Sequence, residues 1–361
     1  MAFLGFVLPQ RRPSGNYETS WVRLIPMMTI AAILVWHLYT YRITFINGAY
    51  DVYVDLFLSV TCIIVIAVAF VLAVCKRRET CNLFKALDGK LESSRVWVSV
   101  ALSSLFIMDL SLFVTVNYVC FAGTFSSLVE CLILALVYPI IPLLLDLHVI
   151  HLMRALNQVY SGTLSRVLSQ GRCCVRTSYS HSGVEDCSSS GCPSGSSFVL
   201  QESQPKSAGQ VNFPDILEQC DSVLYVVDLH NQVFSSWTLV RCGALMAKLL
   251  NASYYLALFF GRWLQFAGSL LYVVNEVGIF LCLCRQADLL KDKHGQLEDA
   301  LLTLQQQPNT PMDDRFRLLS LFFRLKNHPA HISIGSVGVL GSHILVTVVN
   351  VVLTFTAILY Q

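Results

Sequence analysis

Charged residues are scarce in this sequence of 361 residues. Asp, Glu, Lys and Arg make up 13% of it, against about 25% in an average soluble protein, while 55% of the residues are hydrophobic. The net charge of +2 gives no indication of a nucleic-acid partner, and we expect none. The sequence also lacks a phosphate-binding loop, a nucleophile elbow and a nucleotide-binding signature. This composition predicts a polytopic membrane protein.

The start of the sequence does not have the pattern of a cleavable signal peptide, and we expect none. The apolar start of the chain is interrupted by Arg11, Arg12, Pro13 and Gly15 before a full hydrophobic region forms. The first long apolar run is therefore expected to act as the targeting signal. Crossing a bilayer takes roughly 20 apolar residues, and the runs of about this length predict an all-α protein with seven transmembrane helices. These runs lie at 24–45, 54–75, 96–119, 123–150, 236–260, 264–286 and 335–360.

The positive charges outside these runs predict the orientation of the chain in the membrane. Lys and Arg gather before the first run and between runs two and three, four and five, and six and seven. On the other side of the membrane lie only Arg42 and Arg262. By the positive-inside rule, the N-terminus is cytoplasmic and the C-terminus is extracellular. A metabotropic, G-protein-coupled receptor has the opposite orientation and is kept as the alternative.

The segments between the runs predict the domain organisation. A Ser-rich insert at 169–209 cannot bury an apolar face and is predicted to be disordered. The segments 212–235, 286–307 and 313–326 are amphipathic and are predicted to be cytoplasmic helices, the third starting after Pro311. The predicted domains are a cytoplasmic N-terminus (1–23), helices one to four (24–153), a cytoplasmic loop (154–235), helices five and six (236–286), cytoplasmic helices (287–334) and the last helix (335–361).

The last predicted helix carries polar side chains at helical spacing. At about 100° per residue they fall within about 40° of one line along the helix. Unpartnered polar groups are costly in hydrocarbon, so this polar stripe must face water or protein. Two interpretations stay open: a pore-lining helix, or a helix–helix contact in which Gly335, Gly338 and Gly341 allow close approach. The polar stripe consists of His343, Thr347, Asn350, Thr354 and Gln361.

Ionisable residues inside the predicted spans are candidate functional residues, because charge is costly in a bilayer. Two acids are expected in spans three and four, and Glu276 lies in the middle of span six. Lys248 of span five could neutralise one of these acids. Aromatic side chains nearby would suit a small organic ligand, although an interfacial aromatic belt is the competing interpretation. The candidate ligand pocket consists of Asp109, Glu130, Tyr254, Tyr255, Tyr272, Asn275 and Glu276.

Two His-x-x-His pairs offer the best constellation for an enzyme. His148 with His151 and His328 with His331 fall near the predicted cytoplasmic face, where membrane di-iron enzymes place their histidine ligands. Such sites usually need more than four histidines, and no carboxylate beyond Asp146 is evident. We therefore expect neither enzymatic activity nor a bound metal or cofactor. A membrane-embedded metal-dependent enzyme or a transporter is kept as the remote alternative.

A motif at the end of the last helix resembles one in a known family. Thr354-Phe355, followed by five residues and then Gln361, is similar to the Thr-Tyr, five residues, Gln-Phe signature that closes the last helix of insect gustatory receptors. The sequence departs from it at Phe355, where Tyr is usual, and after Gln361, where the family has Phe. In the family, residues at this end of the last helix narrow the channel pore, so the second departure changes the sequence at that constriction. Thr356 stands where the sugar-sensing branch usually has Glu, which argues against a sugar receptor.

Three further segments strengthen the resemblance. Asn231-x-x-Phe234-Ser235 is similar to the segment that leads into the family's fifth helix. The stretch Asp313–Phe323 resembles the amphipathic segment before the last helix, and Gly335 resembles the glycine at the start of that helix. At the level of motifs, the resemblance covers roughly residues 215–361.

The resemblance implies a taste receptor that is itself a ligand-gated, non-selective cation channel. Its ligand would be a small-molecule tastant, and the last helix of each subunit would line the pore. Four subunits, identical or of different gustatory receptors, would meet around a central axis, with the cytoplasmic helices of 287–334 forming an anchor between them. The resemblance also implies a multi-pass protein in the plasma membrane of sensory neurons.

Overall fold

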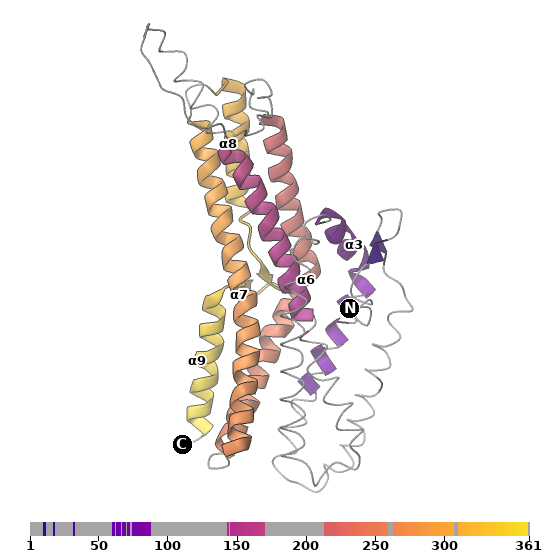
Figure 1. Cartoon of the computed structure of the whole chain (residues 1–361), viewed down its shortest axis with the longest axis vertical. Helices are drawn as coiled ribbons and strands as arrows, with labels where there is room; N and C mark the ends of the chain where they lie inside the picture. The colour runs from indigo at the N-terminus through magenta and orange to yellow at the C-terminus, as the bar shows by residue number, and fades with distance from the viewer. Residues whose placement is uncertain are drawn as a thin grey trace, which may run out of the picture. The chain divides into compact units, whose positions relative to one another are not determined.

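The computed structural model is mainly helical in the part of the chain that it describes (Figure 1). The helices are α3 (Arg77–Ala86), α6 (Phe213–Leu258), α7 (Trp263–Gln305), α8 (Met312–Asn327) and α9 (Ser342–Leu359), and residues 145–169 are also helical. The strands form antiparallel pairs, β1 (Gln10–Arg11) with β2 (Tyr17–Glu18) and β3 (Ser333–Ile334) with β4 (Gly338–Val339). The structure describes residues 10–11, 17–18, 32, 60–61, 63–65, 67–69, 71–72, 74–87, 143, 145–169, 213–258, 263–306 and 310–359.

Part of the sequence prediction falls outside these residues. Almost all of the predicted span 24–45, all of 96–119 and most of 123–150 lie there, as does all but the first residue of the Ser-rich insert 169–209. Within the described residues, the mainly helical structure predicted from composition and periodicity is confirmed.

The two long helices α6 and α7 each join a predicted cytoplasmic helix to a predicted span. The segments 212–235 and 236–260 were predicted as separate elements, but α6 is a single helix of 46 residues. It continues because its only proline, Pro214, lies in the first turn, where the missing N–H costs nothing. At 1.5 Å per residue α6 is roughly 70 Å long, more than twice the roughly 30 Å hydrocarbon core of a bilayer.

Membrane-spanning capacity can be judged from length and composition. Among the described residues, two helical stretches, Pro214–Tyr254 and Leu270–Gln305, are long and apolar enough to cross a membrane, and Ser342–Ile358 is a shorter apolar helix. These stretches include much of predicted spans five and six and most of the last predicted span.

The last predicted helix starts later than the sequence suggested. Residues 335–341 were predicted to be helical, but α9 begins at Ser342, and β3 and β4 form a hairpin before it. In this hairpin Ser333 pairs with Val339 and Ile334 with Gly338. The reason lies at Gly335, whose φ of 55° is left-handed and therefore incompatible with a right-handed helix.

The helix α8 follows its sequence signals closely. It begins after Pro311, as predicted, and its first turn contains Asp313 and Asp314, whose negative charges are favourable at a helix N-terminus. Three leucines at spacings of three and four residues form its buried face, namely Leu318, Leu321 and Leu325.

The chain divides into two compact units. The first contains the start of the helical segment 145–169, most of α6, the first part of α7, the β3–β4 hairpin and α9. The second contains the remaining ends of these helices together with α8. The first unit consists of Met1–Val159, Tyr225–Asp292 and Ala330–Gln361, and the second of Tyr160–Leu224 and Lys293–Pro329.

Candidate functional site

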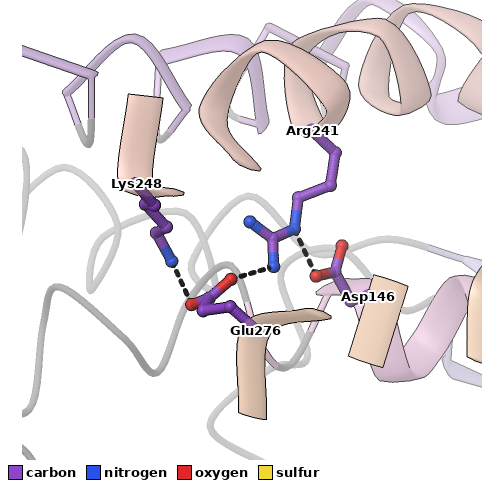
Figure 2. Close-up of polar contacts among 4 residues, drawn as sticks. All are labelled: Asp146, Arg241, Lys248 and Glu276. Atoms are coloured by element: carbon purple, nitrogen blue, oxygen red, sulfur yellow. Dashed lines mark hydrogen bonds and ion pairs between the residues drawn. The ribbon is translucent and has the colours of Figure 1, made fainter. Parts of the chain in front are cut away.

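Four charged side chains form a buried charge cluster in the first unit, namely Asp146, Arg241, Lys248 and Glu276 (Figure 2). They come from the helical segment 145–169, from α6 and from α7. The two cations are seven residues apart on α6, so helical periodicity places them on one face. Their side chains and those of the two acids are between 1% and 5% exposed.

The cluster is a continuous chain of ion pairs. Arg241 donates through Nε to Asp146 Oδ2 and through Nη2 to Glu276 Oε2, the latter over 2.7 Å. Lys248 Nζ donates to the other oxygen of Glu276, Oε1. Two acids balance two cations, which buried charge requires because an unpaired ion away from water is very costly.

The sequence predicted only part of this arrangement. Lys248 was expected to neutralise one of the buried acids, and its contact with Glu276 confirms this. The pairing of Arg241 with both Asp146 and Glu276 was missed. A signal existed, since Arg241, like Lys248, is a charged residue in a mostly apolar run and therefore needs a partner. Among the described residues, Asp146 Oδ1 and Arg241 Nη1 have no hydrogen-bond partner.

The residues of the predicted ligand pocket differ in their surroundings, and some of them lie outside the described residues. Both carboxylate oxygens of Glu276 are occupied by cations. Lys248 Nζ lies 5.8 Å from the centroid of the Tyr272 ring, within range of a cation–π interaction. Asn275 is buried and Tyr254 is half-buried. Asp109, Glu130 and the side chain of Tyr255 lie outside the described residues. The ligand pocket stays a prediction.

The polar stripe of α9 is exposed along the described helix. His343, Thr347, Asn350 and Thr354 are all exposed, whereas Val348 and Val352 are buried. The hydroxyl of Thr347 donates to the His343 carbonyl over 3.0 Å, and that of Thr354 to the Asn350 carbonyl over 2.8 Å. α9 therefore packs through the side that carries Val348 and Val352, and the polar stripe faces away from its own chain, as do the apolar residues Val346, Leu353, Phe355 and Ile358. Gln361 lies outside the described residues.

The β3–β4 hairpin is bound to α6. The side chain of Asn231 donates through Nδ2 to the His331 carbonyl over 2.8 Å and accepts through Oδ1 from the Ser333 N–H over 3.0 Å. One turn further along α6, the Ser235 carbonyl accepts from the Gly335 N–H over 2.9 Å. Segments about 100 residues apart in the sequence are thus joined by three hydrogen bonds.

The start of α9 is bound to α7. The carboxylate of Asp288 accepts through Oδ2 from the Ser342 N–H over 3.1 Å and from the Ser342 hydroxyl. A Cβ atom added at Gly341 would lie 2.7 Å from Asp288 Oδ1, so the absence of a side chain there permits this close approach. Figure 1 shows α9 starting beside the middle of α7.

Comparison with known proteins gives a fold and no sequence family. No protein-family model matches the chain, and no curated protein matches it. The structure of the insect olfactory receptor OR5 from Machilis hrabei in complex with eugenol matches with a TM-score of 0.65, covering 99% of this chain and 94% of that one at 13% identity. The fold is that of an insect olfactory receptor. A second OR5 structure gives a TM-score of 0.61 at 12% identity, covering 100% of this chain and 96% of that one.

This olfactory-receptor fold brings the gustatory-type motif residues together. Asn231 and Ser235 bind the hairpin that contains Gly335, so three residues from two motifs belong to one structural contact. Phe234 lies on the same face of α6 as Asn231 and Ser235, and its side chain is buried. Phe355, at the other end of α9, is exposed beside Thr354. The two motifs were predicted as separate signatures, and their contact was not foreseen.

At least two of the four histidines in the His-x-x-His pairs make contacts within the fold. His148 stacks on Phe84 with ring centroids 5.3 Å apart. The backbone carbonyl of His331 is an acceptor for Asn231, and His328 is exposed. Among the described residues, no group of three or more His, Cys, Asp or Glu side chains is placed to hold a metal ion.

Proposed function

We propose that this chain is a gustatory-type receptor subunit of a ligand-gated, non-selective cation channel. The observation that carries the proposal is the exposed polar stripe on the apolar helix α9. A membrane helix with such a face needs water or another protein against it. Placed around a central axis, the stripes of several subunits would enclose a polar path through the membrane, lined by Thr347, Asn350 and Thr354.

Three further observations support the proposal. OR5, which has the same fold, was solved in complex with eugenol, so this fold can accommodate a small organic molecule. The gustatory-type motifs favour a tastant as the ligand, and Thr356 argues against a sugar. On α8, Met312, Phe316 and Phe323 are exposed apolar residues. They lie within about 40° of one line on the helix, as a contact between cytoplasmic anchors of a homo- or heterotetramer requires.

An Asn350→Leu variant should reduce the single-channel conductance at equal surface density, because it replaces a polar lining group with an apolar one.

A matched pair of threonine variants on α9 tests which side of the helix faces the pore. Thr347→Val removes a hydroxyl from the polar stripe, and Thr356→Val removes one from the opposite side of α9. We expect a change in conductance of about twofold or more for Thr347→Val, since one polar contact is worth roughly 0.5–1.5 kcal/mol. Thr356→Val should conduct normally.

Currents would be recorded from cells that express the chain, with a panel of small organic molecules including eugenol as probes. Equal effects of the two threonine variants would contradict the assignment of the pore-facing side. Unchanged conductance and ion selectivity in both Asn350→Leu and Thr347→Val would contradict the pore-lining role of α9.

Membrane orientation separates the channel from the metabotropic alternative. The channel proposal places the N-terminus in the cytoplasm and the C-terminus outside. Epitope tags at the two termini, stained in intact and in permeabilised cells, measure this directly. Staining of an N-terminal tag in intact cells would overturn the proposed topology and favour a G-protein-coupled receptor.

A further inference from the structure

We propose that α6 is coupled to α9 through the β3–β4 hairpin and that α7 is coupled to α9 directly, and that Asn231 and Asp288 are positioning residues that set the balance between the closed and open pore. The inference rests on the proposed channel function. It concerns how the position of the pore helix is controlled, and both residues lie away from the polar stripe.

The first connection runs from Asn231 to the hairpin. Its side-chain amide both donates and accepts, so it binds the backbone of residues 331–333 at two points, as a neighbouring β-strand would. The bond from Gly335 to the Ser235 carbonyl extends this contact by one helical turn. Three hydrogen bonds within a five-residue stretch fix the hairpin to α6.

The second connection runs from Asp288 to the first residue of α9. Its carboxylate accepts two hydrogen bonds from Ser342, one from the backbone and one from the hydroxyl. Hydrogen bonds to an ionised carboxylate are stronger than neutral ones. A negative charge at a helix N-terminus is also favourable to the helix dipole. Asp288 therefore acts as a cap for α9 that is supplied by another helix.

The two connections lead to one pair of linked helices. Arg241 of α6 and Glu276 of α7 are joined in the buried charge cluster, so the two helices are held to each other. A shift of this pair would move the hairpin through Asn231 and the start of α9 through Asp288. Since α9 carries the polar stripe, the shift would reach the proposed pore.

The first test measures the agonist concentration for half-maximal current, together with single-channel conductance, in Asn231→Leu and Asp288→Asn. The contact of Asn231 with the hairpin and the contact of Asp288 with Ser342 hold α9 in the same position. Both variants should therefore shift this concentration in the same direction, by at least about threefold for the loss of such hydrogen bonds. Conductance should be unchanged. Asp292→Asn is the matched control: it removes the same charge from an exposed position one turn along α7 and should leave the concentration unchanged. In a Ser342→Ala background, the Asp288→Asn effect should shrink, because the two residues share one contact.

The second test does not depend on current. Hydrogen exchange of the purified full chain in lipid nanodiscs should be at least about threefold faster at the Ser342 amide in Asp288→Asn and at the Ser333 amide in Asn231→Leu. Unchanged exchange at both amides would overturn the inference. A purely structural role predicts lower surface density with an unchanged half-maximal concentration, which would also overturn it. If the unmodified chain passes no current with the probe panel, the channel proposal fails, and with it the gating role, whereas exchange still tests the two connections themselves.

Discussion

An Arg241→Met variant should lose about 3–5 kcal/mol of stability, because Asp146 would stay buried without a cation. Arg241 is the only residue in the buried charge cluster that contacts Asp146, while Glu276 retains Lys248. Met fills a similar volume without a charge, so the loss reflects electrostatics more than packing. The measurement is the thermal midpoint in detergent, followed as the fraction of protein that remains monodisperse after heating.

Two companion variants test the reason for this loss. Asp146→Leu combined with Arg241→Met removes one acid and one cation and leaves the Glu276–Lys248 pair balanced, so it should recover most of the lost stability. Arg324→Met breaks the surface ion pair between Arg324 and Asp221, in which the arginine side chain is 57% exposed and the aspartate side chain 47%. It should cost no more than about 1 kcal/mol, because water screens this pair. If the double variant were as unstable as Arg241→Met alone, lost packing and not the stranded carboxylate would explain the result.

The parts of the structure that local sequence dictates were predictable. The ends of α8 agree with the predicted helix 313–326 to within a residue, because a proline, two aspartates and a periodic run of leucines are all local signals. The polar stripe of α9 was found in the same way, since its residues share a face through the helical period alone. Lys248 was matched to an acid because a charge in an apolar run needs a partner.

The long-range contacts were not predictable in the same way. Asp146 and Arg241 are 95 residues apart, and the sequence gives no register that places them at the same depth. The same holds for Asn231 and the hairpin, which are about 100 residues apart. The late start of α9 was missed for another reason. An apolar run with three glycines suits a membrane helix as well as a hairpin, and only the backbone conformation of Gly335 decides between them.

A Gly335→Ala variant should lose about 1–2 kcal/mol of stability, because it forces a residue with a side chain into the left-handed region of backbone conformation. The φ of Gly335 is 55°. Crowding adds to the strain, since a Cβ there would lie 2.9 Å from Cδ2 of Leu239. Gly335→Asn should show less backbone strain, because Asn adopts left-handed conformations more readily than Ala. The thermal midpoint in detergent again measures the loss.

Strain and crowding at Gly335 can be separated with two controls. Gly338→Ala adds a Cβ to the same hairpin where no atom beyond the two neighbouring residues lies within 4 Å and where φ is outside the left-handed region, so it should be nearly neutral. Shortening Leu239 to Ala relieves the crowding but leaves φ unchanged. Because the end of a partly exposed leucine moves easily, we expect strain to dominate, and Gly335→Ala should cost nearly as much in the Leu239→Ala background. A full rescue there would show that contact with α6, and not the backbone, is what requires glycine at this turn.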